Sequence, residues 1–485
     1  MAVASREESG KDGMPPSVIQ PATEGHSGLF PLELTAFEEY MFTDDRPSQP
    51  MMIVLVSEVT GDLRESEFRE AAGELFAAHP LLRCVVGRIS GRLHWIPVPC
   101  ADNIVEWVEL PAQEFRSLVP DLRRRDLRQQ TGCCLRVLHS TSGSRIFLEV
   151  HHACCDGLAA VHLVAELFAR YGVKTAAEGG KAPEFEPPGI DLLCQRDQFR
   201  PPSAKRKRSR GELAAKIWRL VSRRPLKLLG SLQRSSSRAQ PFVAHQKAFW
   251  LQTLPPAELQ RLHQCAARQH VSINDLLLQQ AFLQVRDWNS DGGQQRPQGW
   301  IRIAVPLSMR QSQHSGIPAC NMVSYGLVTH QAEEADDPAT LLQKIQAKTS
   351  TFLRSSEGRI ALRIFSVLRR IPFGMRVFLS HSSGSGTIVI TTVGDVSRRL
   401  RCSFPLTDGK WIAGNVVVES FGGAPPVRKG TSVAITVAEY AGELTVGLRS
   451  DGAVISEADS QAFLTEFMGR LRAVAAAQAT SSSGS

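Results

Sequence analysis

The chain has 485 residues, of which 42% are hydrophobic and 21% are charged, and its formal net charge is +8. Since this length exceeds the size at which a single hydrophobic core stops growing, we expect two lobes. No apolar run approaches the roughly 20 residues of a membrane span, and residues Met1 to Gly25 lack the apolar segment of a secretory signal. The sequence therefore predicts a cytoplasmic protein that is neither secreted nor membrane-spanning.

The predicted elements alternate between strands and helices along the chain, and the class is therefore mixed α/β, with sheets and flanking helices. Apolar runs and alternation predict strands at 51–60, 81–88, 145–150, 300–307, 387–392, 415–420, 432–438 and 444–449. Helical spacing predicts helices at 65–78, 158–171, 255–269, 275–288, 341–353 and 457–475.

Composition shifts divide the sequence into five segments. We expect a disordered polar N-terminus (1–28), an N-terminal lobe (29–198), a basic amphipathic linker (199–240), a C-terminal lobe (241–476) and a disordered tail (477–485).

The basic linker holds most of the excess positive charge, with one acid, Glu212, between Arg200 and Arg238. Trp218 and several leucines recur there at roughly helical spacing. Two interpretations stay open: a solvated linker with one helix docked on the body, or peripheral contact with an anionic membrane on its inner face. Binding to nucleic acid is not expected, because no zinc-finger spacing or RNA-recognition signature accompanies the charge.

The ten cysteines form no CxxC pair and no Cys/His spacing typical of a metal site, so we expect free thiols and no bound metal. No serine lies in a GxSxG elbow, and no GxxxxGK[ST] phosphate loop occurs. Hydrolase, redox and nucleotide-binding motifs are thus missing, and no resident cofactor is expected.

One segment carries chemistry, His151-His152-Ala-Cys-Cys-Asp156-Gly157, placed where a predicted strand passes into a predicted helix. Neighbouring strand residues point to opposite faces, so one histidine can enter a cleft while the other packs behind it. Asp156 is positioned to cap the helix or to bind a distant basic side chain, and Gly157 permits close backbone approach. The alternative is a pair of hydrogen-bonded core histidines with Asp156 as a simple cap.

This segment resembles the HHxxxDG motif of the chloramphenicol acetyltransferase-like and condensation-domain superfamily of acyltransferases. Further segments are similar to that family in the expected order, at 34–55, 68–87, 271–288 with its Asn274-Asp275 pair, and 304–310. The nearest branches are stand-alone wax ester synthase/diacylglycerol acyltransferase-like and polyketide-associated proteins.

The resemblance implies two chloramphenicol acetyltransferase-like lobes that form a tunnel. It implies transfer of an acyl group from acyl-CoA or an acyl carrier protein, a phosphopantetheine thioester, to a small or lipid alcohol or amine, with O-acyl transfer in lipid metabolism favoured. His152 would act as general base, His151 as buried support, and Asp156 as the partner of Arg310.

Two alternatives stay open beside this interpretation. Asn321 either supplies a hydrogen bond near the cleft or has a structural role at a strand edge. The chain as a whole is expected to be a monomeric enzyme, and the alternative is a catalytically silent condensation-like protein that binds an acyl carrier or scaffolds an assembly.

Overall fold

A computed structural model describes residues 28–99, 104–112, 114–116, 118–119, 121–199, 223–228, 249–290, 297–354, 357–381 and 386–482. The basic segment from Lys205 to Arg238 lies outside these residues except for 223–228. No helix in the described part of the chain is long and apolar enough to cross a membrane.

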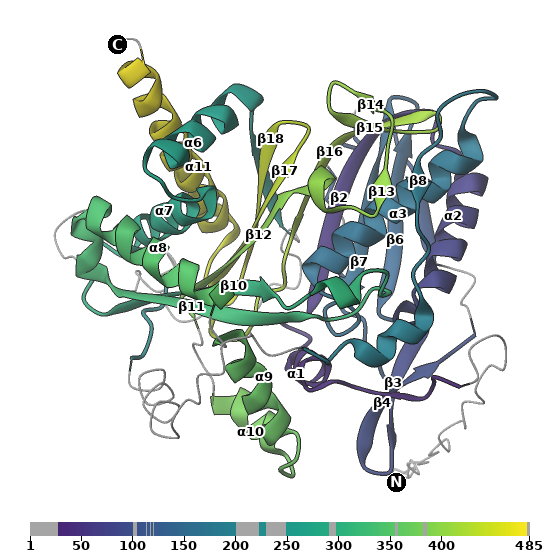
Figure 1. Ribbon diagram of the computed structural model, residues 1–485, viewed down its shortest axis with the longest axis horizontal. Helices are drawn as coiled ribbons and strands as arrows, with labels where there is room; N and C mark the ends of the chain where they lie inside the picture. Colours follow the sequence, from purple (N-terminus) through teal and green to yellow (C-terminus); the bar gives the residue numbers. More distant parts are fainter. Residues whose placement is uncertain are drawn as a thin grey trace, which may run out of the picture.

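Two large mixed sheets, flanked by helices, form the two lobes (Figure 1). The N-lobe sheet has seven strands in the order β14-β15-β16-β2-β7-β6-β5, and the C-lobe sheet has six in the order β11-β10-β12-β17-β18-β9. The predicted α/β class with two lobes is confirmed. The N-lobe strands are β2 (Met52–Gly61), β5 (Val105–Glu109), β6 (Cys133–Ser140), β7 (Gly143–His151), β14 (Leu406–Thr407), β15 (Lys410–Ala413) and β16 (Val416–Ala424).

The C-lobe strands are β9 (Trp250–Leu254), β10 (Trp300–Ser308), β11 (Val323–Gln331), β12 (Ile388–Asp395), β17 (Val433–Tyr440) and β18 (Glu443–Ser450). Short strands make two further sheets: β1 (Leu32–Glu33) with β4 (Arg92–Pro97) and β3 (Cys84–Ile89), and β8 (Glu184–Phe185) with β13 (Cys402–Ser403).

The N-lobe helices α2 (Glu65–Ala78) and α3 (Gly157–Thr175) pack together, and α3 contacts strands β2, β7 and β15 of the sheet (Figure 1). The C-lobe carries α6 (Pro256–Arg268), α7 (Ile273–Trp288), α8 (Pro338–Arg354) and α11 (Glu457–Ser482). Helix α1 (Ala36–Asp44) contacts α9 (Glu357–Leu368) and α10 (Gly374–His381) between the lobes.

Local signals fix several helix starts. Thr35 and Glu38 form a reciprocal capping box at α1, and Ser272 and Asp275 form another at α7. Each box satisfies amides that the first helical turn leaves without an intrahelical acceptor.

Three features differ from the sequence prediction. Strands β14–β16 come from the C-terminal part of the chain but join the N-lobe sheet, where β16 pairs with β2, so the boundary at 241 does not separate the two sheets completely. The stretch 81–88 begins as a 3₁₀ turn, Pro80–Arg83, before β3. Helix α11 continues to Ser482, into the segment expected to be a disordered tail.

The two sheets meet at glycines on β16 and β18. A Cβ atom on Gly447 would lie 1.8 Å from the carbonyl oxygen of Gly423. Because any side chain would collide with main chain there, glycine lets the lobes approach closely.

Candidate active site at the junction of the lobes

The HHACCDG segment lies at the end of β7, where His151 pairs with Met52 of the neighbouring strand β2. The main chain then turns: the His152 amide donates to the carbonyl of Met51 at 2.7 Å, and the Cys154 amide donates to the carbonyl of His151 at 2.8 Å. Helix α3 begins at Gly157, and Asp156 caps it by accepting from the Ala159 amide at 3.0 Å. The predicted strand, tight turn and helix are all present.

His151 is fully buried behind this turn. Its Nδ1 accepts a hydrogen bond from the Ala153 amide at 3.0 Å, so in the neutral ring the proton is on Nε2. That Nε2 lies 3.7 Å from Oδ1 of Asp45, whose Oδ2 accepts from Arg124 Nε at 2.6 Å. His151 thus packs behind the turn with one hydrogen bond, from the Ala153 amide, and with Asp45 nearby.

His152 is half-buried and packs against Phe37, with ring centroids 6.1 Å apart. Its Nδ1 has no hydrogen-bond partner among the described residues. Burial lowers the pKa of His152 below its usual value, because charging the ring in an apolar environment is unfavourable. The imidazole is therefore neutral at pH 7, the state that can accept a proton.

Asp156 and Arg310 form the predicted ion pair. Arg310 Nη1 donates to Asp156 Oδ2 at 2.8 Å, and the Met322 amide donates to the same oxygen at 2.8 Å. Burial alone would raise the pKa of Asp156, but Arg310 and these hydrogen bonds outweigh it and lower that pKa. Asp156 is thus an ionised, structurally engaged carboxylate.

Asn321 contacts the motif from the other lobe. Its Nδ2 donates to the carbonyl oxygens of His152 at 2.7 Å and Ala153 at 2.8 Å. Three C-lobe residues, Asn321, Arg310 and Met322, therefore contact the turn that carries His152. Asn321 lies just before β11, and because it contacts the main chain of the turn, it positions that turn.

Gly157 differs from its expectation. A Cβ atom there would meet nothing within 4 Å, so the glycine does not serve a close approach of protein backbone. It lines a cavity instead, together with Asp156 and Arg310. Sequence reasoning could not find this, because the space is formed by distant strands.

Cys154 and Cys155, at the variable positions of the motif, are fully buried. Burial raises the pKa of both thiols, and neither is a thiolate at neutral pH. Both side chains pack in the core of the N-lobe.

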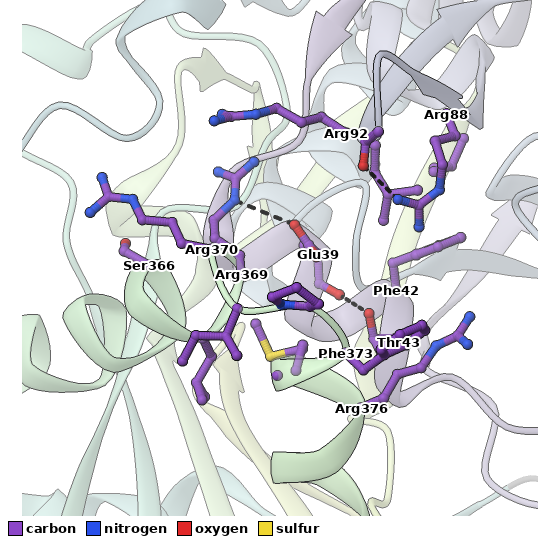
Figure 2. A pocket seen from close by; sticks show the side chains of 18 of the residues that line it. Glu39, Phe42, Thr43, Arg88, Arg92, Ser366, Arg369, Arg370, Phe373 and Arg376 are labelled. Atoms are coloured by element: carbon purple, nitrogen blue, oxygen red, sulfur yellow. Dashed lines mark hydrogen bonds and ion pairs between the residues drawn. The ribbon is translucent and has the colours of Figure 1, made fainter.

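The described residues enclose two large cavities, and one of them borders the motif. One, of about 900 Å³, is lined by the start of α3 and by the ends of β10 and β12, and Asn274 and Asp275 of α7 face it. The other, of about 1060 Å³, lies between α1, the β3–β4 hairpin and the segment that joins α9 to α10 (Figure 2). Asp45 forms part of its wall. His152 lines neither cavity, but Asp156 borders the first and Asp45, the neighbour of His151, borders the second.

An aromatic cluster that the sequence did not single out connects His152 to the C-lobe. Phe37 contacts His152, Tyr325 of β11 and Phe365 of α9, with centroids 5.9 to 6.3 Å apart. Phe365 stacks on Tyr40 at 4.1 Å. The side of His152 toward α9 is therefore apolar.

Comparisons with known proteins agree with this architecture. No family model matches the chain. Over 153 residues it is 30% identical to two uncharacterized proteins of Mycobacterium tuberculosis, MT2362 of strain CDC 1551 and Rv2305 of strain H37Rv. That stretch covers 31% of this chain and 35% of each relative, so the chain matches about a third of their length.

Solved structures match over nearly the whole chain. The first condensation domain of the calcium-dependent antibiotic synthetase, in complex with a substrate analogue, has a TM-score of 0.64 at 15% identity, covering 92% of this chain and 96% of that one. The starter condensation domain of rhizomide synthetase in complex with C8-CoA gives 0.62 at 14%, covering 91% and 94%. Polyketide synthase associated protein 5 from Mycobacterium tuberculosis gives 0.60 at 15%, covering 91% and 98%. The chain thus has the two-lobed fold of condensation domains and of polyketide synthase associated protein 5.

Proposed function

We propose that this protein transfers an acyl group from a CoA or carrier-protein thioester directly to an alcohol or amine, with His152 as the general base. The observation that carries the proposal is the turn bearing His152: groups of both lobes fix it, and its Asp156 borders the cavity of about 900 Å³. A cavity of that size beside the turn offers room for a substrate.

The chemistry needs no protein nucleophile. An acceptor hydroxyl or amine forms a bond to the thioester carbonyl carbon while the neutral imidazole of His152 takes its proton. The carbon–sulfur bond then breaks, and the leaving thiolate receives that proton from the imidazolium. General-base help of this kind contributes about 10² to 10⁴ in rate.

The donor class is supported by the resemblance of the motif and by the fold shared with a condensation domain whose structure contains C8-CoA. The finer parts of the proposal are an O-acyl transfer to a lipid or small alcohol, as in wax ester synthase-like proteins, by a cytoplasmic monomer. Contact of the basic segment 205–238 with the inner membrane surface belongs to the same proposal, and apart from 223–228 that segment lies outside the described residues.

The test is a screen of acyl-CoAs from acetyl to palmitoyl against alcohols and amines, in which thiol release and acylated product are measured. We expect acceptor-dependent thiol release by the wild-type protein and its loss in His152→Ala. His263→Ala, which removes an exposed histidine paired with Glu439, is the matched control. Acyl-CoA binding without turnover for any pair would instead favour the silent carrier-binding alternative.

A further inference from the structure

Large apolar side chains are exposed at eight positions in the described part of the chain. Four of the eight fall within residues 367–377, which we call the α9–α10 corner. Ile89, at the tip of the β3–β4 hairpin, is a fifth on the same side, because both segments wall the 1060 Å³ cavity. The eight are Ile89, Leu118, Val173, Val367, Ile371, Phe373, Val377 and Leu406.

The exposure follows from the amphipathic pattern of α9 and α10. Phe365 of α9 and Met375 and Leu379 of α10 are buried, so these helices dock by one face and leave Val367 and Val377 on the other. Contiguous exposed apolar side chains of this kind mark an interaction site.

Phe373 is the tip of the corner. Its side chain is 71% exposed, the highest value among the exposed large apolar residues in the described chain. Its backbone has a φ of 57°, a left-handed conformation that residues other than glycine rarely adopt. The fold thus holds a large aromatic ring outward at this turn.

The charge around the corner is positive. From Gly358 to Gly394 the chain has no aspartate or glutamate, and its basic residues are Arg359, Arg363, Arg369, Arg370 and Arg376. The cavity wall adds Arg88, Arg92 and Arg128 against three acids, Glu39, Asp45 and Asp197. Figure 2 shows Arg88, Arg92 and Glu39 in this wall.

The arginines of this wall are engaged to different degrees. Arg369 contacts Glu33 and Glu39, and Arg92 contacts Glu33. Asp45 is paired with Arg124, so its negative charge does not neutralise the arginines of the corner. The side chains of Arg370 and Arg376, both exposed, contact no acid among the described residues, and they remain available to an outside anion.

We propose that the α9–α10 corner, with the tip of the β3–β4 hairpin, binds the surface of an anionic lipid bilayer. Ile371 and Phe373 enter the headgroup layer while Arg370 and Arg376 contact anionic headgroups. Apolar tips flanked by unpaired arginines fit this partner, because one surface offers both an apolar interior and negative charge. The 1060 Å³ cavity then opens toward the bilayer, and this goes beyond the proposed acyl transfer.

The first experiment is co-sedimentation of the full chain with vesicles of phosphatidylcholine alone or with 30% phosphatidylglycerol. We expect binding to the anionic vesicles that falls at least about tenfold in Ile371→Ser/Phe373→Ser and several-fold in Arg370→Gln/Arg376→Gln. Val173→Ser/Leu406→Ser removes exposed apolar groups elsewhere and should bind like the wild type. His152→Ala should also bind normally, which separates this proposal from the proposed reaction.

The second experiment locates the tip. Tryptophan introduced as Phe373→Trp should add fluorescence that brominated lipids quench, and Leu406→Trp should not respond. Unchanged sedimentation of both corner variants, absence of binding to anionic vesicles, or equal quenching at both positions would overturn the proposal. Capture of an acidic carrier protein by the same arginines, with no vesicle binding, would overturn it in favour of a protein partner.

Discussion

Arg310 Nη1 donates to Asp156 Oδ2 at 2.8 Å, and the two residues lie 154 positions apart on different lobes. The same arginine donates from Nη2 to the carbonyl of Cys320 at 3.1 Å. A single guanidinium thus joins the N-cap of α3 to the loop that precedes β11. The contact fastens the turn of His152 to the C-lobe.

Removing Asp156 should destabilise the protein. In Asp156→Ala the partly buried Arg310 loses its counter-charge, and breaking a pair of this kind costs about 3 to 5 kcal/mol of unfolding free energy. Urea denaturation measures it. Asp62→Ala, which removes the exposed partner of Arg64, is the control and should cost at most about 1 kcal/mol. Equal losses in the two variants would show that the Asp156 pair is not a structural link.

The meeting point of the sheets should tolerate no side chain at Gly447. A Cβ atom there would lie 1.8 Å from the Gly423 carbonyl oxygen, so Gly447→Ala should lower the unfolding free energy by about 1 to 3 kcal/mol. Gly469→Ala is the matched control, because nothing lies within 4 Å of a Cβ on that helical residue. It should gain about 0.5 to 1 kcal/mol. A gain in both variants would contradict the close approach of the lobes.

The free energy of unfolding should decrease as the pH is lowered, because of His162, which lies one turn into α3. Burial, with Arg401 and Arg310 nearby, lowers the pKa of His162 to about 4. The unfolded chain takes up this proton near pH 6.5 and the folded chain does not. The stability that the neutral His162 contributes is therefore fully present above about pH 6.5 and is lost as the pH falls toward about 4. The total loss is about 3 kcal/mol.

Urea denaturation of the wild type and His162→Gln between pH 7.5 and 4.5 measures this effect. The variant should lose less stability over that interval. Parallel curves for the two proteins would contradict the shift.

Sequence reasoning recovered the elements whose signals are local. Helix α2 was predicted with its observed bounds, since an amphipathic run ends before Pro80, and the turn of His152 follows from a strand directly preceding a helix. The pairing of β16 with β2 joins residues more than 350 positions apart, and no local pattern carries that register.

The site shows the same limit. The Asp156–Arg310 pair was predicted through resemblance, but the contacts of Asn321, the open space at Gly157 and the aromatic cluster of Phe37 depend on how the lobes pack. Helix α9 was missed, although Ile360, Ile364 and Leu368 repeat at four-residue spacing and could have indicated it.

The account depends most directly on His152, and the pH dependence of kcat/KM for the preferred donor and acceptor tests it. Since burial lowers the pKa of His152, the basic form predominates at neutral pH, and the wild-type kcat/KM should decline only as the pH falls into the acid range. His152→Ala should lower kcat/KM by about 10² to 10⁴ and lack that decline, with unfolding free energy near the wild-type value. A folded His152→Ala variant with near-wild-type turnover and the same pH profile would contradict the role of His152 as the base.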